Sequence, residues 1–284
     1  MTAPESASQK VDTDDTEIAS LYAVLGDPVA HSLSPLMHNR AFSVVGHKGI
    51  YVALKVTDIG AAIKGIRALG FGGVSVTIPH KVTVMEYLDE IDAMAVKIGA
   101  VNTIVNRDGR LVGFNSDYLG AVRALQDVTS LRGKSVAIIG AGGAARAAGV
   151  SVMSEGATVT IVNRSVHRGE ALAAEMGADF SPLTEFDGAE TDILVHTTPV
   201  GMTPREQDSP VKPEVLRPSM VVMDIVYNPL RTRLLQEAER IGCVTINGVA
   251  MFVYQGAFQF ELWTKQPAPL EIMRETVSEA LGGI

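Results

Sequence analysis

The stretch VAIIGAGGAAR, from Val136 to Arg146, decides the fold. Its apolar start predicts a short buried strand, its glycines predict a tight turn, and its alanine-rich end predicts a helix. A strand that turns on glycines into a helix leaves backbone N–H groups free at the helix start, where the helix dipole also favours an anion. A second apolar strand, at 158–162, follows about 20 residues later, as a βαβ unit requires. The stretch therefore predicts a dinucleotide-binding turn, and an α/β turn that binds nothing is the alternative.

Length and composition fit two globular domains. At 284 residues the chain is long enough for two domains of ordinary size, and its 46% apolar residues can fill their cores. The net charge of −8 argues against a nucleic-acid surface, which would need a basic face. Half of that charge lies in residues 1–17, a polar acidic segment with too few apolar residues to fold. A small anionic substrate is therefore compatible with the remaining chain.

The cysteine and histidine content bears on location and cofactors. Cys243 is the only cysteine, so no intrachain disulfide can form, and we expect a cytoplasmic protein. The acidic start lacks the apolar core of a secretory signal, and no stretch is long and apolar enough to span a bilayer. The six histidines show no ligand spacing, so we expect no metal site.

A helix start lies within GDPVAHSLSPLMHN, from Gly26 to Asn39. Ser34 before Pro35 predicts serine as the N-cap and proline at the first helical position. Ser32 lies two residues earlier, so in an extended lead-in both hydroxyls point the same way and can face one ligand. For Ser34 alone, capping is the stronger interpretation, but capping does not explain Ser32.

The next candidate group follows a predicted buried strand in GGVSVTIPHK, residues 72–81. Thr77 and Lys81 fall at its carboxyl end, where parallel sheets place functional groups. A solvated helix start is the simpler interpretation of a lone lysine there. However, a helix N-terminus favours anions, which leaves Lys81 without a structural reason.

Residues 101–114 predict a β-hairpin. Asp108-Gly109 is a two-residue turn between β-rich runs, and a turn centred on it pairs residues whose numbers sum to 217. Asn102 then lies opposite Asn115, with Asp117 just beyond. Two amides and a carboxylate at the open end of the hairpin suit a polyhydroxylated ligand. Capping of the helix predicted at 118–128 is an equally good interpretation of Asp117, and the two roles are compatible.

The end of the second strand of the βαβ unit indicates which dinucleotide binds. Folds that select NAD usually place an acidic residue here to hold the ribose 2′-hydroxyl. This chain has Asn163 and Arg164, with Arg168 one helical turn later. Two guanidinium groups can bind a 2′-phosphate through charge-assisted hydrogen bonds, whereas a carboxylate would repel it. The sequence therefore predicts NADP(H).

Three further strands are expected, at 192–196, 220–224 and 243–246. The loops after the first two, TTPVGM and IVYNP, would edge the cofactor crevice. Asn247-Gly248 then leads into a long helix on which Met251, Gln255, Phe258 and Leu262 share one face. A buried glutamine on that face needs partners, and a ligand or the backbone can supply them equally well.

Taken together, the motifs resemble the shikimate dehydrogenase family, including its quinate/shikimate relatives. The resemblance rests on an ordered set that spans most of the chain: SLSPLMHN, SVTIPHK, GAVNT, GFNSDYLG, GAGGAAR, NRSVHR, TTPVGM and NGVAMFVYQGA. It implies reversible, NADPH-dependent reduction of 3-dehydroshikimate in aromatic amino-acid and chorismate biosynthesis. It also implies two α/β domains separated by a cleft: a substrate-binding domain of residues 20–126 plus 249–284 and a doubly wound NADP domain of residues 127–248, after an acidic tail of residues 1–19.

The resemblance assigns roles to individual residues. Lys81 and Asp117 would be the catalytic pair, with Lys81 transferring a proton to or from the reacting oxygen and Asp117 orienting Lys81. The residues expected to bind the substrate are Ser32, Ser34, Thr77, Asn102, Asn115, Tyr227 and Gln255. The residues expected to bind the cofactor are Gly140, Ala141, Gly142, Gly143, Ala144, Asn163, Arg164, Ser165, Arg168, Thr198, Val226, Gly248 and Met251.

Two departures from the family pattern bear on the pocket. Ala250 stands where the family usually has a second glycine, and Tyr118 stands where smaller residues or tryptophan are common. A quinate-oxidising enzyme of broader cofactor use and a non-catalytic, ligand-sensing relative are the alternatives. Retention of Lys81 and Asp117 favours an enzyme over a sensor. The expected partner is a small-molecule substrate, and the expected assembly is a monomer or a homodimer.

Overall fold

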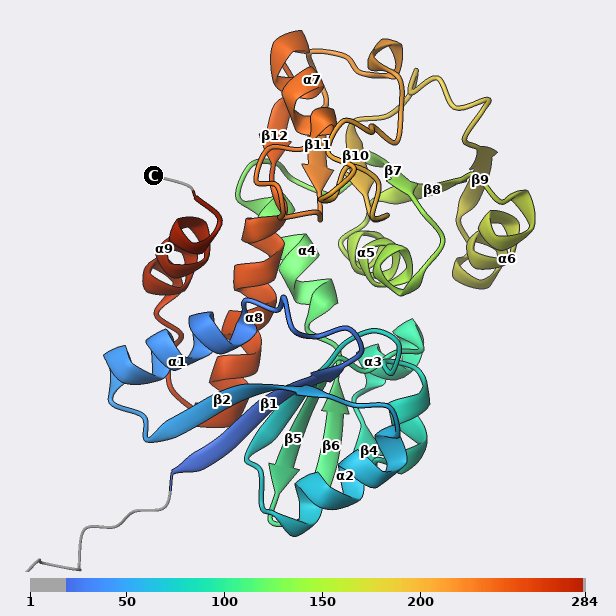
Figure 1. The fold of residues 1–284 in the computed structure, drawn as a ribbon. Coiled ribbons are helices and arrows are strands. Elements are labelled where there is room, and N and C mark those ends of the chain that lie inside the picture. Colours follow the sequence, from blue (N-terminus) through green and yellow to red (C-terminus); the bar gives the residue numbers. More distant parts are fainter. Residues whose placement is uncertain (1–18, 283–284) are drawn as a thin grey trace, which may run out of the picture.

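Two six-stranded sheets organise the molecule, which the computed structural model describes for residues 19–282. In Figure 1 the first sheet lies below and the second above, with helices packed on both. The predicted acidic tail, residues 1–19, lies outside the described residues except for Ala19. The expected α/β class is confirmed.

The first sheet is mixed and has the order β2-β1-β3-β5-β6-β4. Its strands are β1 (Ser20–Gly26), β2 (Gly49–Lys55), β3 (Gly73–Val76), β4 (Glu90–Ile91), β5 (Thr103–Arg107) and β6 (Arg110–Phe114). Its helices are α1 (Ser34–Val45), α2 (Ile59–Ala68), α3 (Ala93–Ile98) and the 3₁₀-helix η2 (Thr83–Tyr87). We call this part the first lobe.

Alternating side chains explain how β1 is covered on both faces. Tyr22 and Val24 pack with residues of α1 on one face, whereas Ala23 and Leu25 pack with residues of α2 on the other. The predicted hairpin is confirmed, because Thr103 pairs with Phe114 and Arg107 with Arg110. Asp108 and Gly109 both have positive φ, at 51° and 88°, as the two-residue turn requires.

The second sheet is entirely parallel and has the order β12-β11-β10-β7-β8-β9. Its strands are β7 (Ser135–Ile139), β8 (Thr158–Asn163), β9 (Asp179–Pro182), β10 (Ile193–His196), β11 (Val221–Asp224) and β12 (Val244–Ile246). Its helices are α5 (Gly143–Ser154), α6 (Val166–Met176), α7 (Arg233–Ile241) and the 3₁₀-helix η3 (Pro213–Val215). The strand order reverses between β7 and β10, which is where doubly wound sheets bind dinucleotides. We call this part the second lobe.

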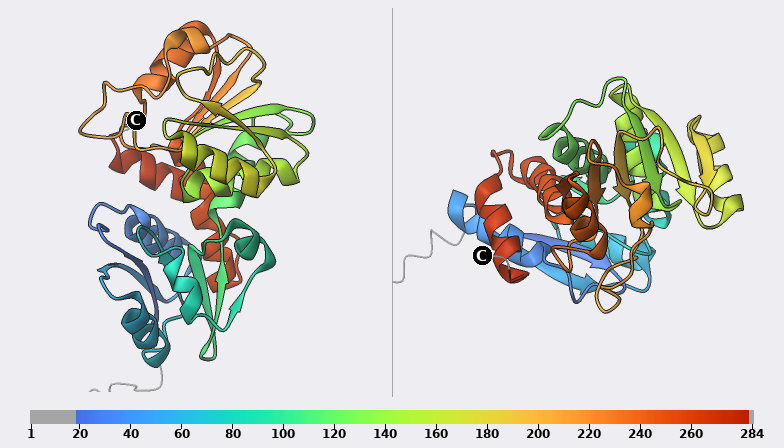
Figure 2. Two further views of the ribbon diagram at one scale, coloured as in Figure 1. Left: turned by 90° about the vertical axis from the view of Figure 1, so that its right-hand side faces the viewer. Right: turned by 90° about the horizontal axis from the view of Figure 1, so that it is seen from above.

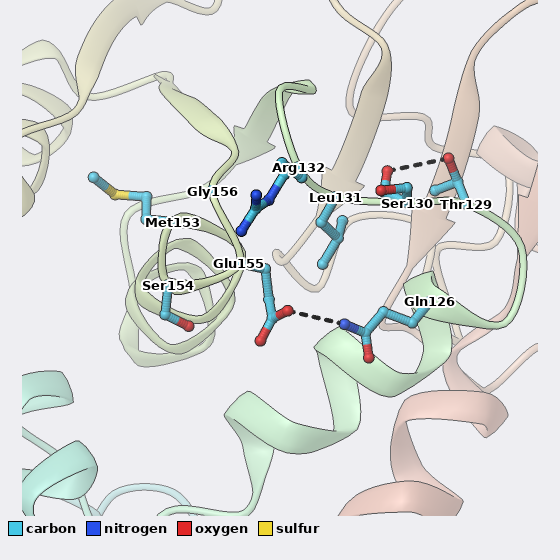
Figure 3. Close-up of a pocket in the computed structure, with 9 residues that line it drawn as sticks. All are labelled: Gln126, Thr129, Ser130, Leu131, Arg132, Met153, Ser154, Glu155 and Gly156. Carbon is cyan, nitrogen blue, oxygen red and sulfur yellow. Dashed lines mark hydrogen bonds between the residues drawn. The ribbon is translucent and has the colours of Figure 1, made fainter.

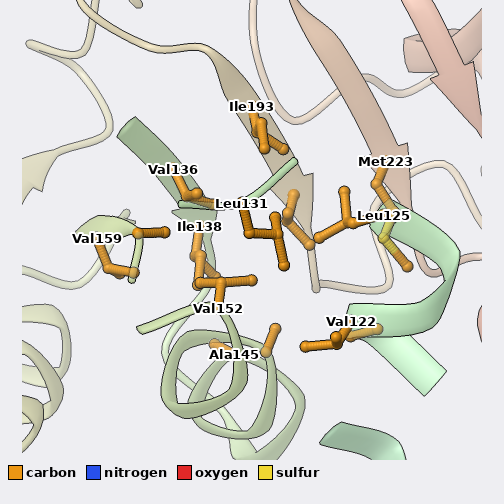
Figure 4. Packing of buried hydrophobic residues seen from close by; sticks show 14 of the residues in the cluster. Val122, Leu125, Leu131, Val136, Ile138, Ala145, Val152, Val159, Ile193 and Met223 are labelled. Atoms are coloured by element: carbon orange, nitrogen blue, oxygen red, sulfur yellow. The ribbon is translucent and has the colours of Figure 1, made fainter. Parts of the chain in front are cut away.

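Buried side chains of β7 and α5 form part of the core of the second lobe (Figure 4). Val136 and Ile138 of β7 pack against Ala145 and Val152 of α5, and all four are nearly fully buried. Burial of each of the larger side chains contributes about 1.5–3 kcal/mol. This packing fixes the strand and the helix on either side of the turn.

Two helices join the lobes, α4 (Asp117–Gln126) and α8 (Gly248–Thr264), and a third, α9 (Leu270–Ala280), packs against α1 and α8. Figures 1 and 2 show α4 and α8 running side by side from the first lobe to the second. The predicted apolar face of α8 is shifted, because Gln255 and Phe258 are half-exposed whereas Val253, Gln259 and Phe260 are buried. Periodicity cannot select a face on a helix that is apolar on nearly every side.

Candidate active site

Lys81 and Asp117 form the central contact of the site. Lys81 follows β3 in the loop before η2, and Asp117 is the first residue of α4. Lys81 Nζ lies 2.6 Å from Asp117 Oδ2, and the two side chains are 28% and 14% exposed. The ammonium group is therefore fixed by a charge-assisted hydrogen bond and still reaches solvent.

The capping interpretation of Asp117 is wrong, although Asp117 does begin the helix. The N-cap of α4 is Ser116, which makes no side-chain capping bond. The backbone of Asp117 is instead fixed by Asn115, because the Asp117 N–H donates to Asn115 Oδ1 at 3.0 Å. Asn115 Nδ2 donates in turn to the Ala100 carbonyl at 2.9 Å. Buried Asn115 therefore fixes the backbone that presents the carboxylate.

The capping interpretation of Ser34 is also wrong. Helix α1 begins at Ser34 itself, and its N-cap is Leu33, which makes no side-chain cap. Ser32 Oγ accepts a hydrogen bond from the Ser34 N–H at 3.3 Å, so the earlier serine serves the helix start. Buried Ser34 lies beside the hydroxyl of Tyr51, whose pKa is raised because its ring is fully buried.

Asn102 and Gln255 are brought together by a residue that the sequence analysis did not single out. Ser116 Oγ lies 3.1 Å from Asn102 Oδ1 and 3.2 Å from Gln255 Oε1. Gln255 also donates to the Phe252 carbonyl at 3.0 Å, so it has the backbone partner that the sequence left open. Because Ser116 precedes Asp117, this group adjoins the Lys81 pair.

Within residues 19–282, the side chains of two other candidate residues, Thr77 and Tyr227, are not hydrogen-bonded to that group. Tyr227 packs against Phe252 with ring centroids 5.1 Å apart, and burial raises the pKa of its hydroxyl. Their roles toward a substrate stay predictions.

A groove lies between the two lobes beside this site. It has a volume of about 480 Å³. Its walls come from both lobes, with Val82, Gly99 and Ala100 on one side and residues of the glycine turn and α6 on the other. The Lys81 carbonyl accepts a backbone hydrogen bond from the Val101 N–H at 2.8 Å, so the catalytic candidate adjoins the groove.

The glycine turn fits a dinucleotide. Gly140 has φ of 129°, and a Cβ there would lie 2.5 Å from Thr197 Oγ1 after β10, so only glycine fits. A Cβ on Gly142 or Gly143 would meet nothing within 4 Å, which leaves open space over the start of α5. The first N–H groups of a helix have no partner within it, and a pyrophosphate binds at such a helix start. Ala141 lines the same groove, and Ala144 follows in the first turn of α5.

The residues after β8 surround the start of α6. Asn163 Nδ2 donates to the Ser165 carbonyl at 2.9 Å, which shapes the turn, and Ser165 is the N-cap of α6 without a side-chain bond. Arg164 and Arg168 are exposed, and Arg168 lines the groove. Neither guanidinium forms a salt bridge with any residue that the structure describes.

The loops after β10 and β11 are tied together by a buried pair that the sequence analysis missed. His196 and Asp224, both 0% exposed, end the two strands, with Nδ1 3.0 Å from Oδ1. His196 Nε2 lies 2.6 Å from Thr198 Oγ1, and the Val226 N–H donates to Asp224 Oδ1 at 2.9 Å. Adjacent strands that both end in polar residues were the available signal.

The start of α8 packs tightly beneath these loops. A Cβ on Gly248 would lie 2.4 Å from the Ile225 carbonyl oxygen, so glycine is required for this close approach. Met251 is buried in the core of the second lobe, and Ala250 packs against that core. Tyr118 packs beside Met94 and Met176 in a cluster that includes Ala100 and Ala147, so it bridges the lobes.

Other features of the described chain lie away from this site. A cavity of about 570 Å³ is lined by the end of α4, the connection to β7 and the end of α5 (Figure 3). Among residues 19–282, no group of three or more His, Cys, Asp or Glu side chains could hold a metal ion. The helices described contain none that is long and apolar enough to cross a membrane.

The fold and the site define a class of protein, a dinucleotide-dependent dehydrogenase with the cofactor turn on one lobe and a lysine–aspartate pair on the other. Comparisons identify the family. The profile of the shikimate dehydrogenase substrate binding domain matches residues 24–104, that of shikimate / quinate 5-dehydrogenase matches 122–227, and that of the shikimate 5'-dehydrogenase C-terminal domain matches 248–277.

Individual relatives agree over most of the chain. The NADP(+) shikimate dehydrogenase of Geobacillus kaustophilus is 48% identical over 92% of this chain and 98% of its own length. That of Bacillus cereus strain B4264 is 44% identical over 93% and 99%. The crystal structure of shikimate 5-dehydrogenase from Thermus thermophilus with NADP(H) and shikimate, 38% identical, covers 92% of this chain and 100% of its own with a TM-score of 0.87. The chain belongs to the shikimate dehydrogenase family.

Proposed function

We propose that this protein is an NADP-dependent shikimate dehydrogenase, which reversibly reduces 3-dehydroshikimate to shikimate in chorismate and aromatic amino-acid biosynthesis. The observation that carries the proposal is the 2.6 Å contact between Lys81 Nζ and Asp117 Oδ2, beside a groove whose other wall holds the glycine turn. Relatives of 44–48% identity that carry this activity in their names support it.

The chemistry of the Lys81–Asp117 pair follows from charge. When bound, NADPH supplies the hydride that reduces the carbonyl carbon. Lys81 Nζ donates a proton to the carbonyl oxygen and neutralises its developing negative charge, and in the reverse direction Lys81 accepts that proton. Asp117 holds the ammonium group in place and accepts a hydrogen bond from a neighbouring substrate hydroxyl.

The remaining polar residues orient the substrate. Ser32 and Ser34 bind its carboxylate. The ring hydroxyls are bound by Thr77, Asn102, Asn115, Tyr227 and Gln255. The buried positions of Asn115 and Asn102 behind the lysine–aspartate pair support this arrangement, because fixed amides cost little entropy when the substrate binds.

The cofactor is held by the second lobe. Residues 140–144 bind the pyrophosphate, and Arg164 and Arg168, with Asn163 and Ser165, bind the 2′-phosphate. Thr198, Val226, Gly248 and Met251 flank the nicotinamide. The exposed guanidinium groups, which form no salt bridge within residues 19–282, support selectivity for NADP(H) over NAD(H).

The domain limits, location and assembly belong to the same proposal. Residues 20–126 and 249–284 form the substrate domain, and residues 127–248 form the NADP domain. The protein works in the cytoplasm as a monomer or a homodimer. Light scattering during size-exclusion chromatography distinguishes the two assemblies.

A turnover assay tests the proposed function. Absorbance of reduced nicotinamide is followed with shikimate or quinate and with NADP⁺ or NAD⁺, in all four combinations. We expect fast reduction only with shikimate and NADP⁺. Comparable turnover with quinate and NAD⁺ would instead indicate the broader quinate/shikimate activity. Binding of shikimate without turnover in any combination would indicate a ligand sensor.

A further inference from the structure

The buried amide of Gln259 lies at the centre of a hydrogen-bond network that reaches two substrate-binding candidates, Asn102 and Gln255. Gln259 lies on α8 one helical turn after Gln255 and is 1% exposed. Its Nε2 donates to Thr103 Oγ1 at 3.0 Å and to Ser116 Oγ at 3.1 Å. Its Oε1 accepts from Ser75 Oγ at 3.0 Å. One side chain therefore links β3, β5 and the residue before α4.

The direction of each hydrogen bond in this network is fixed by backbone groups. The Ser116 N–H donates to Asn102 at 2.6 Å, which makes the acceptor atom Oδ1. Gln255 donates to the Phe252 carbonyl, which makes that atom Nε2 and turns its Oε1 toward Ser116. Neither assignment depends on a choice between nitrogen and oxygen in the side chains.

The two hydroxyls then have only one consistent arrangement. Thr103 Oγ1 donates its single proton to Asn102 Oδ1 at 2.8 Å. Ser116 Oγ has Gln255 Oε1 and Asn102 Oδ1 as its acceptors. Both hydroxyl oxygens must therefore accept from Gln259, and an NH₂ group is the side-chain group that donates to both at once.

We propose that Gln259 is a positioning residue: by donating to the Thr103 and Ser116 hydroxyls it turns their protons toward Asn102 Oδ1 and Gln255 Oε1, and so reinforces the backbone contacts that leave the N–H groups of both amides for the substrate. Every hydrogen bond between the Asn102 side chain and residues 19–282 involves Oδ1, so its Nδ2 is available to a ligand. Gln255 uses one N–H on the backbone and keeps the second. The groups that they bind are therefore oxygen acceptors of a hydroxylated ring, an inference that rests on the proposed function.

Substitutions of this network separate positioning from folding. Gln259→Met keeps a similar length and removes every hydrogen bond, so the protons of Thr103 and Ser116 can reorient. Thr103→Val is a smaller change that removes only the donor to Asn102. Gln236→Met is the matched control, because Gln236 is exposed on α7 and donates to a backbone carbonyl.

The expected result is a split between kinetic constants. Gln259→Met should raise the KM for shikimate about tenfold, as for loss of one or two oriented hydrogen bonds, with kcat and the KM for NADP⁺ within about twofold. Thr103→Val should also raise the KM for shikimate. This second variant tests the inference if Gln259→Met does not fold. In a double variant with Asn102→Ala, either change should raise the KM for shikimate by a smaller factor than it does alone.

Several outcomes would overturn the inference. An unchanged KM for shikimate in Gln259→Met or Thr103→Val would do so, as would full additivity with Asn102→Ala or an equal effect of Gln236→Met. If the wild-type protein oxidises shikimate and the variants give one of these contradicting results, the positioning role of Gln259 is refuted but the proposed function stands. A wild-type protein that does not oxidise shikimate would overturn the proposed function and the inference together.

Discussion

Two exposed side chains at the start of α6, Arg164 and Arg168, are proposed to set which dinucleotide the protein prefers. The double change to glutamine should weaken NADP⁺ at least about tenfold, because it removes charge-assisted hydrogen bonds to the 2′-phosphate. NAD⁺ lacks that phosphate and should bind almost as before. Calorimetric titration with each dinucleotide measures both effects, with exposed Arg240→Gln on α7 as the control. Equal losses for both dinucleotides would contradict the assignment.

A single buried histidine should make stability depend on pH. His38 is 0% exposed, stacks on Tyr51 and has no hydrogen-bond partner for either ring nitrogen within residues 19–282. Burial lowers its pKa from 6.5 to about 3, and a weaker interaction with Gln259 opposes this shift. Below pH 6.5 the unfolded chain therefore binds a proton that the folded protein excludes, so stability falls as the pH decreases toward 3.

The size of this effect can be measured by denaturant unfolding at two pH values. At pH 5, His38 should cost about 2 kcal/mol of stability relative to pH 7.5. Between pH 7.5 and pH 5, the His38→Leu variant should therefore lose about 2 kcal/mol less stability than the wild type. The same pH dependence in both proteins would show that His38 is not responsible.

Individual roles came mainly from the family resemblance. For Lys81 alone a solvated helix start was the simpler interpretation, but the structure brings it to Asp117 as the resemblance implied. Ser34 and Asp117 fitted helix caps so well that sequence alone favoured or balanced that interpretation, but neither side chain makes a cap. Gln259 was missed because its partners come from three distant segments, which sequence spacing cannot reveal.

Among the elements, β10 and β11 owe the placement of their loops to the buried His196–Asp224 pair. His196→Ala should destabilise the protein by about 2–4 kcal/mol, because Asp224 would stay buried with one partner fewer. It should also weaken NADP⁺ binding, since Thr198 would lose its 2.6 Å contact. Urea unfolding and dinucleotide titration measure the two effects.

A conservative change separates this effect from simple loss of packing. His196→Asn keeps an amide that can donate to Asp224, so it should recover part of both losses. If both variants are as stable as the wild type and bind NADP⁺ equally well, the pair does not hold the loops.

Element positions were predictable where the chain carries local signals. The Asp108-Gly109 turn set the register of β5 and β6. The buried face of α8 was not predictable, because it is set by two lobes that pack on the helix from different sides. Local pattern determines an element, whereas tertiary contacts determine which face is buried.

On the scale of the whole molecule, the glycine turn lines a groove that neither lobe forms alone. One wall carries the glycine turn and Arg168, and the other adjoins Lys81. The two-lobe arrangement followed from the βαβ unit and the family resemblance. The exact contacts between lobes, such as Tyr118 against the cluster with Ala147, required the structure.

The proposed catalysis depends above all on proton transfer by Lys81, which Asp117 holds in place. The most direct test is kcat and KM of Lys81→Ala for shikimate at saturating NADP⁺, beside exposed Lys97→Ala as the control. We expect kcat to fall by about 10²–10⁴-fold with a much smaller change in KM, because the lost interaction acts mainly in the transition state. An unchanged kcat in Lys81→Ala would contradict the account.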